Sequence, residues 1–249
     1  MTDLSLEKIK VLQPGFMTKV YGWMSLALAI TAVTSTLVAS SDFLLALVFS
    51  NRFTFYGLLA AEVLLVLYIG RNLMNMASGT AALFFLFYAF LNGITLSVIF
   101  LAYTSASVAS TFLVTGGTFG AMSLYGYFTK KDLSSWGNIL LMAIVGLIIA
   151  SVVNLFFYNE VLYWISSGAG VLIFVGLTAY DTQKIKTIGL MQEEGSEEEK
   201  KTSLLAALSL YLDFINLFLY LLRFLATGDN GFAEPEAKKM ARKPSFLLF

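Results

Sequence analysis

The sequence predicts an all-α polytopic membrane protein whose other helices pack around the last one. Hydrophobic residues make up 58% of the 249 residues and charged residues only 13%, which is about half the share typical of a soluble domain. Apolar runs of about 20 residues, the length that a helix needs to cross a bilayer, recur along the chain. In the final run, 204–226, the polar residues are three and four apart and so share one face, as in a helix inside a bundle.

Seven stretches are long and apolar enough to span a membrane. Most connections between them are short, so neighbouring helices are predicted to run antiparallel. The long connection Thr182–Ser203 is rich in Glu and Lys and is predicted to be a mobile, acidic loop. The domain organisation is therefore a cytoplasmic segment 1–19, a transmembrane domain 20–226 and a tail 227–249. The predicted spans are Val20–Ser40, Phe53–Gly70, Thr80–Ala102, Val108–Phe128, Asn138–Phe157, Val161–Asp181 and Leu204–Ala226.

The positions of Lys and Arg predict a cytoplasmic N-terminus, because basic residues collect in inner loops. In this orientation Arg52 is the only basic residue in an outer connection, and seven spans place the C-terminus outside. The tail carries a basic cluster of its own at 238–243, which opposes that placement. The basic residues in the inner segments are Lys8, Lys10, Lys19, Arg71, Lys130, Lys131, Lys184, Lys186, Lys200 and Lys201.

Composition excludes several functions. The chain has no cysteine and no histidine, which excludes disulfides and thiolate or imidazole metal sites and leaves carboxylates, Tyr or Lys for proton chemistry. The 16 basic and 16 acidic residues cancel, so we expect no nucleic-acid partner. No cofactor motif is present, and Leu210, Tyr211 and Leu212 precede Asp213 where an intramembrane aspartyl protease needs glycine. We therefore expect no enzymatic activity and no bound cofactor.

Small and amide residues within the spans predict helix packing. Gly116 and Gly120 form a GxxxG pattern, followed by Gly126, and all three are expected at close helix contacts. Asn92 and Asn154 are expected to form hydrogen bonds between helices.

The polar face of the last span is the first candidate for function. Ser209, Asn216 and Tyr220 follow this face, and together with Glu62 of the second span they are predicted to line a pore. Arg223, at the outer end of the same face, is expected to reach the membrane interface as an anchor.

Asp181 and Asp213 are predicted to form a pair. Each is 16 residues from Glu197, the middle of the last hairpin, so the two carboxyl groups are expected at the same depth. Two carboxylates in a low dielectric share one proton and titrate as a unit. The pair is a candidate pH sensor and gate, and it could bind calcium in place of the proton. Arg71, on the same inner side, is a candidate latch for Asp181.

A structural role for the aspartates is the alternative. Asp181 and Asp213 could cap helix ends or bind neighbouring hydroxyl groups such as those of Thr182 and Tyr211.

Four segments resemble the bacterial members of the Bax inhibitor family, the transmembrane Bax inhibitor motif proteins. They are LTAYDTQKIK (Leu177–Lys186), SLYLDFINLFLYLLRFL (Ser209–Leu225), FGAMSLYGYFTKKDLSSWG (Phe119–Gly137) and LNGITLSVIF (Leu91–Phe100), and the resemblance covers residues 19–226.

This resemblance implies seven helices, with six around a central last helix, and a pH-sensitive calcium leak gated by paired aspartates. Asp181 and Asp213 fall on the positions of that pair, and the family's second-helix arginine corresponds to Arg71. We therefore expect a calcium leak channel in a bacterial inner membrane, with the lipid bilayer and calcium ions as partners. The alternative is an interaction protein that regulates a membrane protease or a cell-death pathway without ion flux. The sequence leaves the oligomeric state open, and a monomer is compatible with it.

Overall fold

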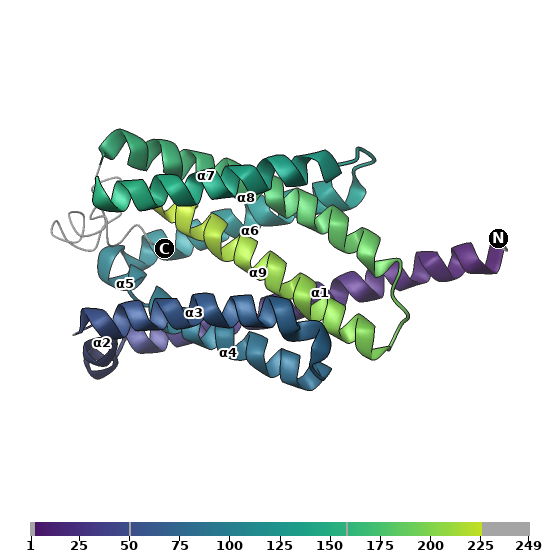
Figure 1. Cartoon of the computed structure of the whole chain (residues 1–249), viewed down its shortest axis with the longest axis horizontal. Helices are drawn as coiled ribbons and strands as arrows, with labels where there is room; N and C mark the ends of the chain where they lie inside the picture. Colours follow the sequence, from purple (N-terminus) through teal and green to yellow (C-terminus); the bar gives the residue numbers. More distant parts are fainter. Residues whose placement is uncertain (1–2, 50, 158, 226–249) are drawn as a thin grey trace. The chain divides into compact units, whose positions relative to one another are not determined.

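The chain folds into helices, as predicted (Figure 1). The computed structural model describes residues 3–49, 51–157 and 159–225, so the predicted tail 227–249 lies outside the described residues. The elements are α1 (Asp3–Ala39), α2 (Asp42–Phe49), α3 (Arg52–Asn72), the 3₁₀ turn η1 (Leu73–Asn75), α4 (Ser78–Leu96), α5 (Ile99–Ala102), α6 (Ser105–Phe128), α7 (Ser134–Phe156), α8 (Glu160–Gly189) and α9 (Glu197–Leu225).

Six segments among the described residues are long and apolar enough to cross a membrane by length and composition. The all-helical membrane class is therefore confirmed. The helix α6, with 24 residues, is also long enough to span, but its many Gly, Ser and Thr residues lower its hydropathy, and its crossing stays a prediction. The six candidate spans are Gly15–Ala39, Phe53–Asn75, Ser78–Ala102, Ser134–Asn154, Glu160–Gly189 and Glu197–Leu225.

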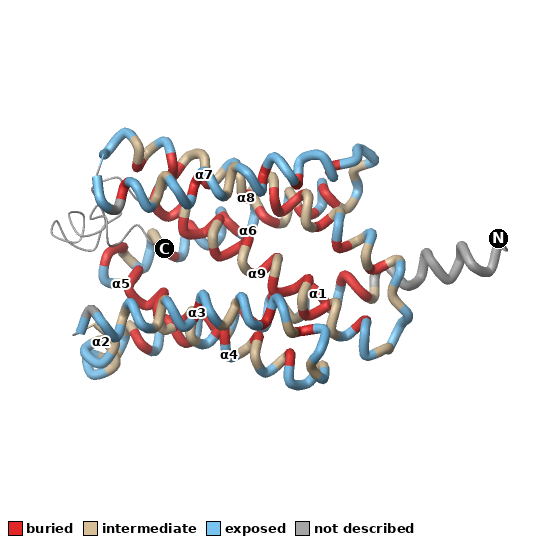
Figure 2. The backbone as a smooth tube through the Cα atoms, viewed as in Figure 1, coloured by how far each residue is buried: buried red, intermediate tan, exposed pale blue. Residues whose placement is uncertain are grey.

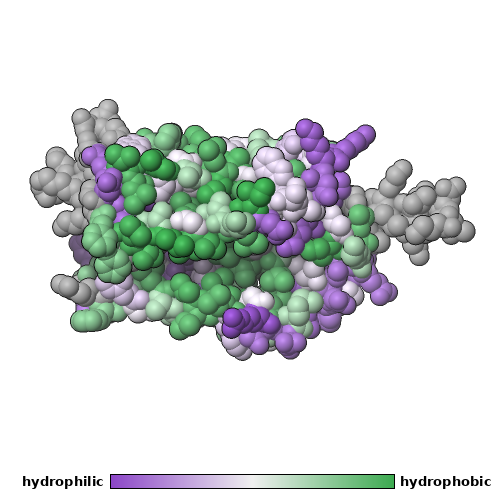
Figure 3. Space-filling model, turned by 45° about the horizontal axis from the view of Figure 1, so that its top comes forward, coloured by the Kyte–Doolittle hydropathy of each residue, from purple (hydrophilic) through white to green (hydrophobic). Residues whose placement is uncertain are grey.

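The most buried of these candidate spans is α9. Two thirds of its most apolar window (67%) is buried, against 11% for α3 and 17% for α7, and Figure 2 shows buried and intermediate residues along much of α9. Most of the exposed large apolar side chains lie on the other helices, and apolar residues cover much of the visible face in Figure 3. Such a surface is what a bilayer requires and what water disfavours.

The chain divides into two compact units. The first unit comprises residues 1–98 and 185–211, and the second comprises residues 99–184 and 212–249. One boundary coincides with a break between α4 and α5, inside a span that the sequence predicted to be one helix. Here the Ser97 hydroxyl donates to the carbonyl of Ile94 at 2.6 Å, and hydroxyl groups that bind nearby carbonyls weaken helix continuity.

In the first unit, α1 packs closely on α4. A Cβ atom at Gly93 would lie only 2.8 Å from the carbonyl oxygen of Thr31, so the absence of a side chain permits the contact. The Tyr211 ring of α9 meets the edges of Phe85 and Tyr88 from α4, with centroids 5.8 and 6.0 Å apart. These contacts form the core of the first unit.

In the second unit, α6 packs against α8 and α9. A Cβ atom at Gly126 would overlap the backbone carbonyl of Ala179 on α8, and the Phe119 ring meets the Phe214 ring of α9 at 5.4 Å. The expected close helix contact is confirmed for Gly126 but was wrong for Gly116 and Gly120, because a Cβ atom at either would meet nothing within 4 Å among the described residues. Glycine spacing alone does not identify which side of α6 faces another helix.

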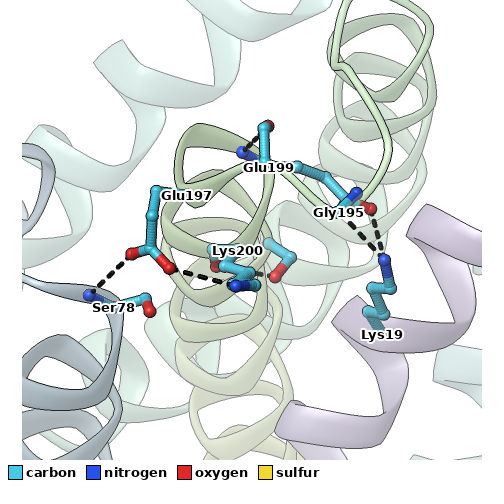
Figure 4. Close-up of polar contacts among 8 residues, drawn as sticks. Lys19, Ser78, Gly195, Glu197, Glu199 and Lys200 are labelled. Carbon is cyan, nitrogen blue, oxygen red and sulfur yellow. Dashed lines mark hydrogen bonds and ion pairs between the residues drawn. The ribbon is translucent and has the colours of Figure 1, made fainter.

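The predicted acidic loop Thr182–Ser203 is mostly helical, and only residues 190–196 separate α8 from α9. The N–H group of Glu199 donates to Ser196 Oγ at 3.0 Å, and the Glu199 carboxylate accepts from the N–H group of Gly195 at 2.8 Å. This arrangement is a variant of the capping box, which fixes a helix start. Lys19 of α1 reaches the same carboxylate at 2.7 and 2.9 Å (Figure 4). Three glutamates in the first turn further favour this start of α9.

Candidate functional site

The second unit brings Asp181 and Asp213 together. A side-chain hydrogen bond links the two carboxyl groups. Asp213 is only 6% exposed, and Asp181 is half-buried. An ionised carboxylate can only accept hydrogen bonds, so this bond requires a proton on one of the two groups. The pairing depends on α8 continuing past Asp181, and α8 extends to Gly189.

The surroundings of the pair argue against the capping alternative. Asp181 and Asp213 both lie inside helices, several residues from either end of α8 and α9. The Tyr211 hydroxyl, a second possible partner, instead forms hydrogen bonds with Thr31 and Asn92 in the first unit. The Oδ2 atom of Asp213 is buried and has no hydrogen-bond partner among the described residues. This oxygen of Asp213 therefore lacks the protein contact that a purely structural carboxylate normally makes.

Gln183, two residues after Asp181, ties a loop to α8. Its Oε1 atom accepts from the N–H group of Leu133, and its Nε2 group donates to the carbonyl of Lys131, both at 2.8 Å. These bonds attach the α6–α7 connection to α8 two residues after Asp181. Sequence reasoning missed this contact, because a glutamine gives no signal of a partner 50 residues away.

The predicted pore-lining residues of α9 are held by local contacts. Asn216 donates to the carbonyl of Leu212 in its own helix at 2.8 Å. The ring of Tyr220 stacks on Phe174, with centroids 5.8 Å apart, and Ser209 is half-buried. The role of these residues in a pore stays a prediction.

Arg223 does not reach out as an anchor, so that expectation was wrong. It is only 7% exposed, and its guanidinium lies over the Tyr220 ring at 5.3 Å. A planar cation over an aromatic face is stabilised by the ring quadrupole, most strongly where water is excluded. The Tyr220 ring therefore stabilises a buried cation that the sequence analysis placed at the membrane interface.

Glu62 belongs to a hydrogen-bonded cluster in the first unit. Its carboxylate accepts from the Thr95 hydroxyl and, at 3.3 Å, from the Asn92 amide. The Tyr211 hydroxyl donates to Asn92 Oδ1 at 3.1 Å and shares a second hydrogen bond, at 2.7 Å, with the Thr31 hydroxyl. We call Glu62, Thr95, Asn92, Tyr211 and Thr31 the Glu62 network; it joins side chains of α1, α3, α4 and α9.

Both amide predictions can be judged from these contacts. The hydrogen bonds of Asn92 join three helices, which confirms its predicted role. Asn154 was predicted wrongly, because its Oδ1 atom accepts from the nearby N–H group of Asn159 at 2.8 Å and closes the end of α7. The pore-lining role of Glu62 stays a prediction.

The latch and metal predictions stay open. Arg71 is exposed at the end of α3 in the first unit, whereas Asp181 belongs to the second unit. Within the described ranges, no three Asp, Glu, His or Cys side chains are grouped to hold a metal ion. A calcium ion at Asp181 and Asp213 would need further oxygen ligands, because calcium takes six to eight.

Comparison with known proteins places the chain in a family. The sequence profile described as inhibitor of apoptosis-promoting Bax1 matches residues 13–230. The inner membrane protein YbhL of Escherichia coli strain K12 is 48% identical over 209 residues, which cover 84% of this chain and 89% of that protein. An uncharacterized protein of Borreliella burgdorferi is 44% identical over 231 residues, covering 92% of this chain and 100% of that protein. With six candidate spans, the chain is a multi-pass inner-membrane protein.

Proposed function

Because the chain belongs to the Bax inhibitor family, we propose that it is a pH-sensitive calcium leak channel of a bacterial inner membrane. The observation that carries this proposal is the buried, hydrogen-bonded pair of Asp181 and Asp213. A shared proton holds the two carboxyl groups together, and in this state the gate is closed.

Loss of the shared proton changes the energy of the pair. Two full charges about 4 Å apart repel by about 4 kcal/mol at an effective dielectric constant of about 20. This repulsion is relieved if the side chains separate or if a divalent cation enters between them. Calcium suits the second outcome, since it prefers carboxylate oxygens and readily accepts further carbonyl or water ligands. The carboxyl pair thereby couples proton loss to the passage of calcium.

We further propose that α6 is a seventh span and that α9 is the helix around which the others pack. In support, α6 contacts α8 at Gly126 and α9 at Phe119, and both partners are candidate spans. Nearer the start of α6, Phe112 also meets Phe218 of α9, with ring centroids 6.1 Å apart. With the N-terminus in the cytoplasm, seven crossings place the end of α9 outside.

Calcium flux into proteoliposomes tests the gate. Wild-type protein is expected to give a flux that changes with pH, and this dependence is expected to disappear in Asp181→Asn and Asp213→Asn. Asp132→Asn is the matched control, because its exposed carboxylate binds Ser134, and this hydrogen bond lowers the pKa of Asp132. The control is therefore expected to behave as wild type.

Two results would contradict the proposal. If both pair variants retain the flux and its pH dependence, the aspartates are not the gate. If folded wild-type protein gives no flux at any pH, the chain is not a leak channel. The result would then favour the alternative function, an interaction protein.

A further inference from the structure

Two buried side-chain oxygens in the described part of the chain have no hydrogen-bond partner: Ser123 Oγ on α6 and Asp213 Oδ2 on α9. Both residues belong to the second unit and are less than 10% exposed. Buried hydroxyl and carboxyl oxygens in native proteins are nearly always bonded, either to protein groups or to ordered water. Two such oxygens in one unit therefore call for a common explanation.

The packing of α6 places Ser123 at the depth of the aspartate pair. Ser123 follows Phe119 by one helical turn and precedes Gly126 by three residues, so the three share one face of α6. Phe119 meets Phe214, the neighbour of Asp213, with ring centroids 5.4 Å apart. Gly126 contacts Ala179 of α8. The serine is thus bracketed by contacts to the two helices that carry the aspartates.

We propose that Ser123 Oγ and Asp213 Oδ2 bind one buried water molecule, and that Ser123 is a positioning residue of the aspartate site. A water molecule can donate to the Asp213 oxygen and accept from the serine hydroxyl, so both oxygens gain a partner. A buried water needs two to four polar partners, and these two oxygens supply the minimum. Such a water exists whether or not ions pass, and so it goes beyond the proposed leak.

Another hydroxyl on the same helix serves as a control. Thr115 is fully buried, but its hydroxyl donates to the carbonyl of Thr111 at 2.7 Å. A helix carbonyl of α6 therefore already satisfies this group. Ser123→Ala and Thr115→Val each remove one buried hydroxyl group, and only the first removes a proposed water ligand.

Infrared difference spectra of calcium-free membranes, hydrated with H₂¹⁶O and then with H₂¹⁸O, test the water site. A bound water gives a sharp O–H stretching band that shifts with the oxygen isotope. We expect this band in wild type, Thr115→Val and Ser123→Thr, its loss in Ser123→Ala, and its displacement in Asp213→Asn. The carboxylic acid C=O band of the pair should also move in Ser123→Ala and stay in place in Thr115→Val.

The proposal is overturned if folded Ser123→Ala, checked by circular dichroism and gel filtration, keeps the isotope-sensitive band. It is equally overturned if wild type lacks the band. Because no calcium is present, either result is independent of the flux measurement, so the water site and the leak channel can fail separately.

Discussion

The two units treat a buried carboxyl group in opposite ways. In the first unit, both oxygens of Glu62 accept hydrogen bonds, and the Glu62 network continues through Asn92 to Tyr211. In the second unit, Asp213 is equally buried, yet its Oδ2 atom has no hydrogen-bond partner among the described residues. The carboxyl group of Asp213 is hydrogen-bonded to a second acid, Asp181. The second unit is held by close contacts such as Gly126 on Ala179 and by aromatic rings.

Under the proposed function, this difference distinguishes an acid that stabilises the fold, Glu62, from an acid that acts in the gate, Asp213. A fully bonded polar network fixes the helices that contribute to it, and removing one member leaves its partners unsatisfied. A partly satisfied acid beside another acid adds little stability but can respond to protons and cations. Glu62 and Asp213 are equally buried, so the contrast between them lies in their hydrogen bonds and not in their burial.

The largest effect is expected from Gly126→Ala, which tests whether packing holds the second unit. The added Cβ atom would overlap the Ala179 carbonyl, and overpacking against a rigid backbone costs about 3 kcal/mol of unfolding free energy. Reversible unfolding in detergent micelles measures the change. Gly120→Ala is the control, because its Cβ atom meets nothing within 4 Å, and equal losses in the two variants would show that the contact is not a packing constraint.

Glu62→Ala comes next and tests the Glu62 network. The substitution leaves the Asn92 amide without its acceptor, whereas the Thr95 hydroxyl keeps only the carbonyl of Leu91, so the same unfolding measurement should show a loss of about 2 kcal/mol. Glu62→Gln keeps an acceptor oxygen and should lose less. A fully stable Glu62→Ala protein would remove the contrast between the two units.

A smaller loss, about 1 kcal/mol, is expected from Lys19→Met. Lys19 pairs with Glu199, whose side chain is only 3% exposed, but Lys19 itself is 41% exposed, so water replaces part of the lost cation and the cost stays near that of a surface pair, about 1 kcal/mol. Lys200→Met is the control, since Lys200 and Glu197 are both exposed and such pairs contribute little. High salt should reduce the difference in unfolding free energy between Lys19→Met and wild type only partly. Identical stability of the two variants would contradict a role for the Lys19 contact.

The smallest effect on stability is expected from Asp213→Asn. The substitution keeps the shape of the side chain, and Asp213 Oδ2 has no donor to lose among the described residues. The Asn amide can still form a hydrogen bond with Asp181, so the unfolding free energy should change by only about 0.5 kcal/mol, the low end of a net hydrogen-bond contribution, while the flux loses its pH dependence. A loss of stability comparable to that of Glu62→Ala would make Asp213 a structural acid as well.

The sequence predicted the parts of the fold that depend on local pattern. Apolar runs predicted seven spans, and six of them correspond to candidate spans of the structure. The equal spacing of Asp181 and Asp213 from Glu197 put them on facing parts of one hairpin. The signal Ser196-x-x-Glu199 could have identified the start of α9, because a serine three residues before a glutamate is the sequence pattern of a capping box. The many Glu and Lys residues around this signal favour a solvated loop instead, and they hide the helix start.

The parts that the sequence could not predict depend on which helix faces which. The partners of Glu62 come from other helices, 30 and 33 residues away for Asn92 and Thr95. Periodicity gives the polar face of a helix but not its neighbour, so Gly126 could not be separated from Gly116. Arg223 was misjudged for a related reason: Tyr220 lies three residues earlier on the same helix, but the spacing does not reveal that this end of α9 is buried.

The compact turn between α8 and α9 limits where the chain can change in length. Gly195 has a positive φ of 80°, a conformation that glycine adopts without strain, and its N–H group and Lys19 share the Glu199 carboxylate. Extra residues after Met191 would enlarge an exposed bend and leave this arrangement in place. Extra residues between Gly195 and Glu199 would separate the cap from its helix. Tags and reporter domains should therefore be tolerated at the first position and rejected at the second.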